Sequence, residues 1–253
     1  MLRRIRNSPY PFRSIVRRTH QHFNPLLYPT LFVNEYPKSG GTWVCQMLSE
    51  ALNWRFDDNR YPRLGPAVIK LHRAKLSQAK RMVLVRDPFD VALSFFHHHR
   101  AVYRDRSFNT GAVNLAIKQI FTPNMSDDEA LDAFVEHIIQ RPITPAQTWG
   151  EFYRKCVDRG DHILRYEDLR ADAAPILARE LDRLKIPVEI AKLIKAQNTH
   201  DIDTILANRG RAEGAFFVRS GAIGEGKRTL SSDACDLIAK DAGELLVRFG
   251  YER

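Results

Sequence analysis

The sequence predicts a three-layer α/β fold, in which helices cover both faces of a mostly parallel central sheet. Four short apolar segments have the composition of buried strands, and they alternate with segments whose apolar residues recur at helical spacing. Strands that alternate with helices favour a parallel sheet, because each crossover helix packs on one of its faces. The length of 253 residues and the hydrophobic content of 44% suit one domain of this class and argue against a disordered chain.

The predicted strands are short and rich in branched apolar residues. They cover Leu31–Tyr36, Ala67–Leu71, Met82–Val85 and His162–Tyr166. In such a sheet, ligands bind at the carboxyl ends of the strands. We therefore expect the residues that follow these strands to form the functional site.

Apolar spacing and capping residues predict the helices. Asp87 and Pro88 suit the N-cap and the first position of one helix, and capping boxes at Ser126–Glu129 and Thr144–Gln147 begin two more. The apolar stripes of the helix after Gly41 and of these three helices comprise Val44, Met47, Leu48, Ala51 and Leu52; Val91, Ala92, Phe95 and Phe96; Leu131, Phe134, Val135, Ile138 and Ile139; and Trp149, Phe152, Tyr153, Cys156 and Val157. Two further helices are predicted over Ile176–Leu184 and Asp233–Phe249.

The net charge of +9 is concentrated at the N-terminus. Residues 1–34 hold six arginines and no lysine, aspartate or glutamate, so the rest of the chain is only mildly basic. Pro9 and Pro11 are expected to interrupt a continuous amphipathic helix there. We expect residues 1–30 to form a basic arm that lies on the domain or on an anionic surface, and residues 31–253 to form a single domain.

Composition excludes several classes of protein. The sequence has no run of 18 apolar residues for a membrane-spanning helix, and no apolar segment follows the N-terminal arginines as it does in a secretory signal. Cys45, Cys156 and Cys235 share no metal-ligand spacing and are too few for a disulfide framework. Free thiols favour a cytoplasmic location, peripheral to a membrane if the arm binds one.

The segment between the first strand and its helix has the features of an anion-binding turn. It reads Tyr36-Pro37-Lys38-Ser39-Gly40-Gly41-Thr42-Trp43. A glycine-containing turn exposes several backbone N–H groups next to the positive end of a helix, and together these bind a phosphate or sulfate. Lys38 adds a positive charge, and Ser39 and Thr42 add hydroxyl groups. The lysine precedes the glycines, unlike in the nucleotide-triphosphate loop G-x-x-x-x-G-K-[ST].

This segment resembles the phosphosulfate-binding loop of the cytosolic-type sulfotransferases, Y-P-K-S-G-T-T-W. Gly41 replaces the first threonine, which removes a hydroxyl group but keeps the backbone N–H. Other segments are similar to motifs of that family in the same order: Val68–His72 to the strand that ends in K-T-H, Val83–Ser94 to the 3′-phosphate segment, Arg165–Leu169 to the Y-E-D segment, Phe217–Lys227 to F-x-R-K-G-x-x-G-D-W-K, and Phe249–Tyr251 to the closing L-G-Y. The resemblance extends from Leu31 to Tyr251 and implies a short, bacterial-like member with the family's P-loop-like fold.

The resemblance implies 3′-phosphoadenosine 5′-phosphosulfate (PAPS) as the donor, 3′-phosphoadenosine 5′-phosphate (PAP) as the product, and no metal. The implied donor residues are Lys38, Ser39, Gly40, Gly41 and Thr42 for the 5′-phosphosulfate; Arg86, Ser94, Arg219, Ser220 and Gly221 for the 3′-phosphate; and Trp43 and Tyr166 for the adenine. Ser220 replaces a lysine of the family, which puts one phosphate contact in doubt. Gly226 replaces the tryptophan of G-D-W-K, which predicts a looser lid over the donor.

The same residues also suit ordinary structural roles. Taken alone, Arg86 would pair with Asp87 or Asp90, and Trp43 and Tyr166 would belong to the core. Only the joint match of the motifs favours the donor site.

Transfer of a sulfonyl group is in-line and needs a base for the acceptor's proton and cations for the transferring oxygens. The resemblance assigns the base to His72, whose imidazole titrates near neutral pH. Lys70 lies two residues earlier on the same strand face and can reach the sulfonyl oxygens, and Lys38 can follow the charge onto the leaving phosphate. Three consecutive histidines, His97–His99, fan out around a helix and are not expected to converge on one metal ion.

Two other functions stay open on the sequence alone, and a sulfotransferase-like scaffold that has lost catalysis is a third option, although Lys38 and His72 are both present. A P-loop kinase shares the architecture, but it needs a Mg²⁺-binding acid where the third strand is followed by Arg86. A nucleic-acid-binding module would use the basic charge, but six of the nine net charges lie in the arm and the sequence shows no recognition motif. We therefore expect no nucleic-acid partner.

The acceptor is left open between a small molecule, a glycan and a lipid. Only 31 residues separate Lys38 from Lys70, fewer than in the family members that sulfate phenols and steroids, which predicts a more open pocket. Trp54, Phe56 and Tyr61 lie in this stretch and suit either the pocket or the core. The family's C-terminal dimer motif has no clear match, so the oligomeric state is open too.

Overall fold

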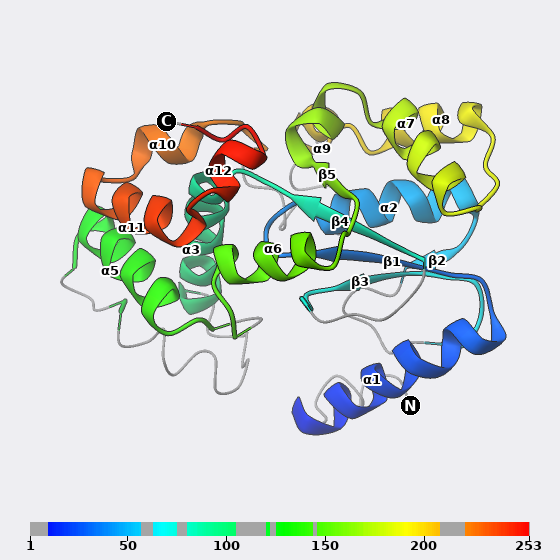
Figure 1. Cartoon of the computed structure of the whole chain (residues 1–253), viewed down its shortest axis with the longest axis horizontal. Helices are drawn as coiled ribbons and strands as arrows, with labels where there is room; N and C mark the ends of the chain where they lie inside the picture. Colours follow the sequence, from blue (N-terminus) through cyan, green and yellow to red (C-terminus); the bar gives the residue numbers. More distant parts are fainter. Residues whose placement is uncertain are drawn as a thin grey trace.

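The computed structural model describes residues 10–56, 63–74, 80–104, 120–121, 125–143, 146–207 and 221–252. Within these residues the chain forms a five-stranded parallel sheet with helices on both faces, which confirms the predicted three-layer α/β fold (Figure 1). The strand order is β2-β3-β1-β4-β5. The strands are β1 (Thr30–Glu35), β2 (Arg55–Phe56), β3 (Ala67–Leu71), β4 (Arg81–Val85) and β5 (Ile163–Arg165).

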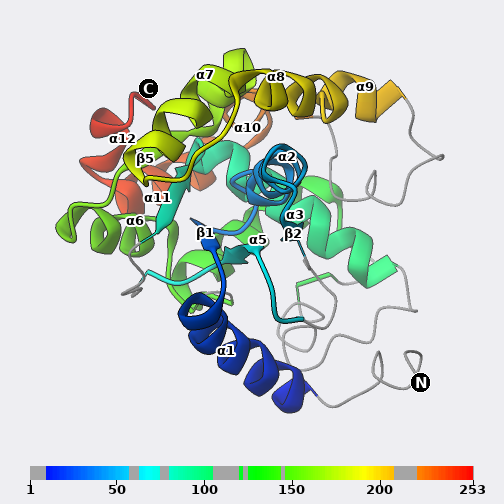
Figure 2. The same ribbon diagram turned by 90° about the vertical axis from the view of Figure 1, so that its right-hand side faces the viewer.

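Two hydrophobic cores lie on opposite faces of the sheet. Val83 and Val85 of β4 point into one core, and Met82 and Leu84 point into the other, because side chains alternate along a strand. The first core is closed by α3 (Pro88–Arg104), α5 (Asp127–Gln140), α6 (Trp149–Asp158), α11 (Ser232–Ala242) and α12 (Leu245–Arg248). The second core is closed by α2 (Gly41–Leu52), α7 (Tyr166–Arg183) and α8 (Ile190–Thr199). Figure 2 shows α7 and α8 side by side along the top of the molecule.

Local sequence signals account for most element boundaries. The four predicted strands are present as β1, β3, β4 and β5, with small shifts at their ends. Asp87 caps α3, because its carboxylate accepts a 2.8 Å hydrogen bond from the Phe89 N–H. Ser126 and Glu129 form the predicted capping box of α5. The two-residue strand β2 is too short to leave a pattern in the sequence.

Three helix predictions need correction. The capping box of α6 is formed by Thr148 and Glu151 and not at Thr144–Gln147. Ala146 has a φ of 62°, which a helix through that residue does not allow, and Thr144 itself lies outside the described residues. The helix predicted over 233–249 is divided by Gly243 into α11 and α12. Helix α7 begins at Tyr166, well before the predicted start.

Helix α1 (Tyr10–Leu27) contradicts the expectation that prolines interrupt a helix in the N-terminal arm. Pro11 is the second residue of this helix, where an N–H has no intrahelical acceptor and its loss costs little. Asn24 fastens the helix to the domain, since its side-chain amide bonds to Thr30 Oγ1 and to both backbone polar groups of Gly65. The other short helices are α9 (Ile202–Ala207) and α10 (Glu225–Thr229). Among the described helices, none has the length and apolar character needed to cross a membrane.

Candidate active site

The carboxyl ends of β1, β3 and β4 meet at one edge of the sheet. β1 runs into the loop 36–40, β3 ends just before His72, and β4 ends just before Arg86. β1 lies between the other two strands, with Asn34 beside Leu71 and Glu35 beside Leu84. The loop, His72 and Arg86 are therefore neighbours, as the strand pattern predicted.

Left-handed backbone conformations turn the loop toward α2. Lys38 has a φ of 76° and Gly40 has a φ of 98°. A side chain at Gly40 is also excluded by its neighbour, because an added Cβ would lie 2.6 Å from Cδ2 of Tyr166. The ring of Tyr166 thus packs directly on the loop.

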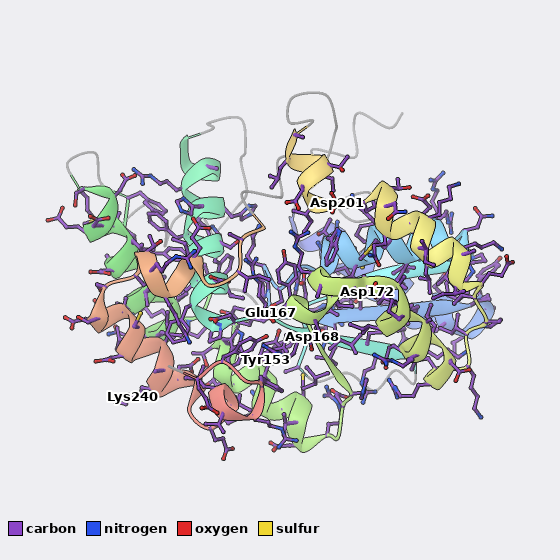
Figure 3. All side chains as sticks on the ribbon, turned by 90° about the horizontal axis from the view of Figure 1, so that it is seen from above. Tyr153, Glu167, Asp168, Asp172, Asp201 and Lys240 are labelled. Atoms are coloured by element: carbon purple, nitrogen blue, oxygen red, sulfur yellow. The ribbon has the colours of Figure 1, made fainter. Side chains whose placement is uncertain are left out.

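The Ser39 hydroxyl points into the core and not toward a ligand. Ser39 is completely buried, and its Oγ lies 3.1 Å from the hydroxyl of Tyr153. The Tyr153 hydroxyl also accepts from the Tyr36 N–H at 3.3 Å and donates to the Leu84 carbonyl at 2.5 Å. Tyr153, which lies near the middle of the molecule in Figure 3, therefore fastens the loop to β4.

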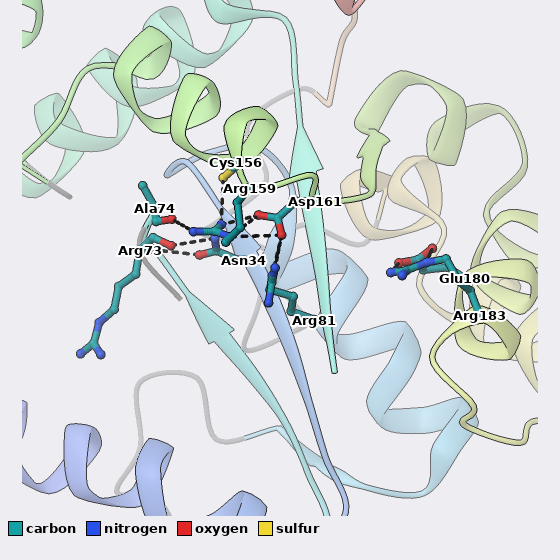
Figure 4. A network of polar contacts seen from close by, with 9 residues as sticks. All are labelled: Asn34, Arg73, Ala74, Arg81, Cys156, Arg159, Asp161, Glu180 and Arg183. Carbon is teal, nitrogen blue, oxygen red and sulfur yellow. Dashed lines mark hydrogen bonds and ion pairs between the residues drawn. The ribbon is translucent and has the colours of Figure 1, made fainter. Parts of the chain in front are cut away.

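The backbone of β1 orients His72. Its Nδ1 lies 3.0 Å from the carbonyl oxygen of Glu35. Because a carbonyl only accepts, Nδ1 carries the proton, and in the neutral ring Nε2 keeps its lone pair. Asn34 holds the next residue, since its amide exchanges hydrogen bonds of 2.8 and 3.0 Å with the backbone of Arg73 (Figure 4). The arrangement presents the tautomer that a general base needs.

A partly buried ion-pair network supports the same segment. Asp161 accepts hydrogen bonds from Arg81 and Arg159, and Arg159 also donates to the carbonyl of Ala74 (Figure 4). Burial opposes ionisation of Asp161, but the bonds from the two arginines hold its pKa below the ordinary value. The chain just after His72 is thus fixed from two sides.

Two lysines bring positive charge to the loop. Lys70 Nζ donates to Thr42 Oγ1 at 2.6 Å, which joins β3 to the first turn of α2. Burial lowers the pKa of Lys38 to about 8, with Glu35 opposing this shift and Lys70 and Arg86 adding to it. An anion bound beside these cations would relieve their mutual repulsion.

The three consecutive histidines have different surroundings. Burial, together with the charges of Lys38 and Lys70, lowers the pKa of His98 to about 4, so this ring lies near the two loop lysines. His97 packs against Phe96, and His99 packs in the core. Within the described part of the chain, no group of potential metal ligands is found.

Arg86 is buried beside the loop and beside Tyr166. Its Nη2 donates to the Ala222 carbonyl at 2.8 Å, and its guanidinium lies 4.5 Å from the centre of the Tyr166 ring. Asp90 lies 3.7 Å from Nη2, the ion pair that the spacing suggested. The buried Nε has no hydrogen-bond partner in the portion of the chain that the structure describes. A buried cationic donor without an acceptor is costly, so this nitrogen suits an anionic ligand such as a phosphate.

The carboxylate of Asp90 holds the segment after residue 220 against α3. It accepts from the N–H groups of Gly224 at 2.9 Å and Gly226 at 2.6 Å. A Cβ at Gly226 would lie 2.2 Å from the backbone carbon of Phe89, so glycine permits this close packing. Arg219 and Ser220 lie outside the described residues, and their contacts with a 3′-phosphate stay predictions.

The residues predicted for adenine lie together but are largely buried. Trp43 is 6% exposed, and its Nε1 donates to the His200 carbonyl at 2.7 Å. Its ring meets that of Tyr166 edge-on, with centroids 5.8 Å apart, and the Tyr166 hydroxyl donates to the Gly221 carbonyl at 3.4 Å. Ser94, which was predicted to bind the 3′-phosphate, is half-buried on α3. Contact of these residues with a nucleotide stays a prediction.

Three polar residues were not predicted for the site: Glu35, Tyr153 and Glu167. Glu167 accepts from the Asp87 N–H at 3.0 Å and from the Tyr251 hydroxyl at 2.6 Å, so it joins α7 to the start of α3 and to Tyr251. For Glu167, the sequence signal was its position in the segment that resembles Y-E-D. Tyr153 was assigned only to an apolar stripe, and Glu35 only to a strand.

Comparisons with known proteins find related sequences over most of the chain. Residues 65–250 match the sulfotransferase domain family. The chain is 21% identical over 268 residues to Sulfotransferase 6B1 of Pan troglodytes, covering 87% of this chain and 77% of that protein. It is 23% identical over 264 residues to Sulfotransferase 6B1 of Mus musculus, covering 87% of this chain and 78% of that protein.

Solved structures of similar fold include two PAP complexes. Mouse sulfotransferase SULT7A1 complexed with PAP has a TM-score of 0.56 at 17% identity, over 88% of both chains. Retinol dehydratase in a complex with retinol and PAP has a TM-score of 0.61 at 17% identity, over 87% of this chain and 82% of that chain.

Proposed function

Because the chain belongs to the sulfotransferase family, we propose that it transfers the sulfonyl group of PAPS to a hydroxyl or amine of an acceptor, with His72 as the general base. The family match favours this activity over the P-loop kinase and the nucleic-acid-binding module. The proposed location is cytoplasmic.

The proposed mechanism rests on the orientation of the His72 ring. With Nδ1–H bonded to the Glu35 carbonyl, Nε2 is the nitrogen that accepts the acceptor's proton. The acceptor oxygen then forms a bond to sulfur, while the bond from sulfur to the 5′-phosphate oxygen breaks. Lys38 stabilises the charge that develops on the leaving phosphate, and Lys70 stabilises the oxygens of the sulfonyl group.

The residues present suit a donor with two anionic ends. The loop amides and Lys38 lie at one end, and Arg86, with its unsatisfied Nε, lies at the other. Arg86 contacts Tyr166, which packs on Gly40, so both ends belong to one continuous site. PAPS bound here supplies a sulfonyl group that is already linked to a good leaving group.

The acceptor class is a small molecule, a glycan or a lipid. Retinol dehydratase, one of the proteins of similar fold, binds androsterone or retinol together with PAP, which supports a small acceptor. Trp54 and Phe56 are partly buried against the second core, and Tyr61 lies outside the described residues.

The test compares His72→Asn and His72→Ala with the wild type, using PAPS labelled with radioactive sulfur and a panel of acceptors. Turnover should fall by about 10²- to 10⁴-fold, the usual effect of removing a positioned base. PAP affinity, measured by calorimetry, should stay the same, because the base faces the acceptor. His22→Asn, in exposed α1, is the control. Full turnover of both His72 variants with chemistry rate-limiting would refute the base, and no PAP binding by the wild type would refute the donor.

A further inference from the structure

Glu35 places a carboxylate in the loop that is proposed to bind the donor. The Gly41 N–H donates a 2.5 Å hydrogen bond to Oε2 of Glu35, whose residue is only 3% exposed. Gly41 is the first residue of α2, and its N–H is one of the free backbone donors that a helix N-terminus offers to an anion. The side chain of the last residue of β1 therefore already places an anion at the helix end of the loop.

The Glu35 carboxylate leaves no room for a side chain at Gly41. A Cβ at Gly41 would lie 2.5 Å from Cδ and 2.6 Å from Oε1 of Glu35. Gly41 is not among the glycines with positive φ, so the backbone conformation does not explain the glycine. A threonine at this position, as in Y-P-K-S-G-T-T-W, would therefore clash with Glu35 in its present place.

The Glu35 carboxylate lies within electrostatic reach of Lys38. It raises the pKa of Lys38 against the lowering effect of burial, so its charge acts directly on the loop lysine. Lys70 reaches Thr42 in the next position of the helix, and Tyr153 also feels the charge of Glu35. Glu35 thus offsets part of the positive charge that attracts a phosphate.

We infer that Glu35 weakens the binding of the nucleotide's 5′-phosphate and so speeds the release of PAP. The inference rests on the proposed function. A 5′-phosphate in the loop is a second anion close to the carboxylate, and it competes with Glu35 for the Gly41 N–H. Product release is rate-limiting in many enzymes, so a residue that raises its rate also raises turnover at saturating substrate.

Glu35→Gln tests this in the Lys38→Arg background, because glutamine keeps the shape and an acceptor oxygen for Gly41 but removes the charge. Arginine keeps position 38 charged when Glu35 no longer raises the pKa of the lysine. PAP should bind about tenfold more tightly or better and dissociate more slowly, since like charges a few ångströms apart repel strongly near a protein surface. Adenosine 3′-phosphate, which has no 5′-phosphate, should bind both proteins equally. Glu50→Gln, near the other end of α2, changes the net charge equally and should leave PAP affinity the same.

The outcomes separate the inference from the proposed function. Equal or weaker PAP binding by Glu35→Gln refutes the inference, as does an equal gain for adenosine 3′-phosphate. No PAP binding by the wild type refutes the proposed function instead. The spatial coupling has its own test: Gly41→Ala should lower the melting temperature in the wild type but much less in a Glu35→Ser background. Equal effects in both backgrounds would refute the coupling.

Helix α1 offers a second surface, independent of the active site. Four of its apolar residues are exposed: Ile15, Phe23, Leu26 and Leu27 are 61%, 52%, 71% and 64% exposed. At about 100° per residue these residues share one face of the helix. The polar side chains of Asn24 and His20 face the domain, where they bond to Gly65 and Arg63. Figures 1 and 2 both show α1 at the edge of the molecule.

We propose that this face docks on an anionic phospholipid membrane. Residues 1–34 carry six arginines and no acid, and Arg18 and His22 are exposed on the helix itself. An outward apolar face with basic residues beside it binds in the interface of an anionic membrane. A second copy of the chain fits less well, because it would bring another six arginines and no acid to the contact.

Sedimentation with phospholipid vesicles tests the docking surface. The full chain should bind vesicles that contain phosphatidylserine but not vesicles of phosphatidylcholine alone. The combined change Leu26→Ser and Leu27→Ser should reduce the bound fraction, whereas Val247→Ser, a 65% exposed residue on α12, should not. No binding to the anionic vesicles refutes the proposal. A dimer that the two serine substitutions dissociate would assign the face to a second copy and refute it as well.

Discussion

A 2.6 Å hydrogen bond joins Nζ of Lys70 to the hydroxyl of Thr42. It links the strand before His72 to the first turn of α2, so the proposed base and the proposed donor loop are parts of one rigid unit. Holding reacting groups in a fixed geometry lowers the barrier of a transfer between two substrates. Substitutions at the donor site are therefore expected to change donor affinity, whereas substitution of His72 is expected to change turnover.

Arg86→Ala should weaken PAP binding by about 2–4 kcal/mol, because it removes a charged hydrogen-bonding partner of the 3′-phosphate. Binding of adenosine 5′-phosphosulfate, which lacks that phosphate, should barely change. Calorimetry with both ligands measures the difference, and Arg183→Ala, whose side chain pairs with Glu180, is the control. Equal losses for both ligands would show that Arg86 acts through the fold.

PAP binding should weaken above pH 8, because the pKa of Lys38 is lowered to about 8 by burial and the lysine loses its charge there. Below this pH Lys38 is charged and binds the anion without taking up a proton. Above it, affinity should fall by up to about tenfold per pH unit as binding must first protonate the lysine. Both phosphates of PAP stay ionised throughout this range.

Lys38→Arg is the matched variant for this pH series, since arginine stays charged. Its PAP affinity should be weaker at neutral pH but nearly constant from pH 7 to about 9.5. A flat profile for the wild type would contradict the role of Lys38.

Transfer should continue in excess chelator, because Lys38, Lys70 and Arg86 neutralise the donor in the proposed mechanism. A P-loop kinase loses its turnover under the same treatment, since Mg²⁺ bridges the nucleotide phosphates. The measurement is sulfonyl transfer with and without EDTA, after dialysis. Complete loss of transfer would exclude a mechanism in which these side chains alone neutralise the donor.

Patterns that act over a few residues predicted their elements well. Asp87 and Pro88 predicted the start of α3, and Ser126 and Glu129 predicted that of α5, because a cap needs only the first turn. The predicted parallel sheet also placed His72 and Arg86 beside the loop, because all three follow strands whose carboxyl ends lie at one edge. Alternation with helices leaves few other arrangements of the strand ends.

Contacts between distant segments could not be predicted in this way. Ser39 and Tyr153 are 114 positions apart, and no spacing in the sequence indicates that their hydroxyls meet. The motif of Trp43 suggests a ring that stacks on the adenine. In the structure the ring is buried, and its Nε1 donates a hydrogen bond to the His200 carbonyl. Gly41 was visible as a departure from a motif, but its contact with the Glu35 carboxylate could be found only in the structure.

Tyr153→Phe should destabilise the protein, although the substitution removes only one oxygen. That oxygen serves the Leu84 carbonyl, the Ser39 hydroxyl and the Tyr36 N–H, all in a buried environment. Leaving buried polar groups without partners costs about 1–3 kcal/mol, so the free energy of unfolding should fall by that amount. Urea denaturation measures it.

The Tyr153→Phe substitution should also lower donor affinity, because Tyr36 and Ser39 are the ends of the turn that holds Lys38. PAP binding to Tyr153→Phe should weaken, with the effect on affinity smaller than that of Arg86→Ala, since no ligand contact is removed. Tyr28→Phe, at a 39% exposed position, is the control and should leave stability within about 0.5 kcal/mol. Unchanged stability together with unchanged PAP affinity would mean that the loop keeps its shape without the tyrosine hydroxyl.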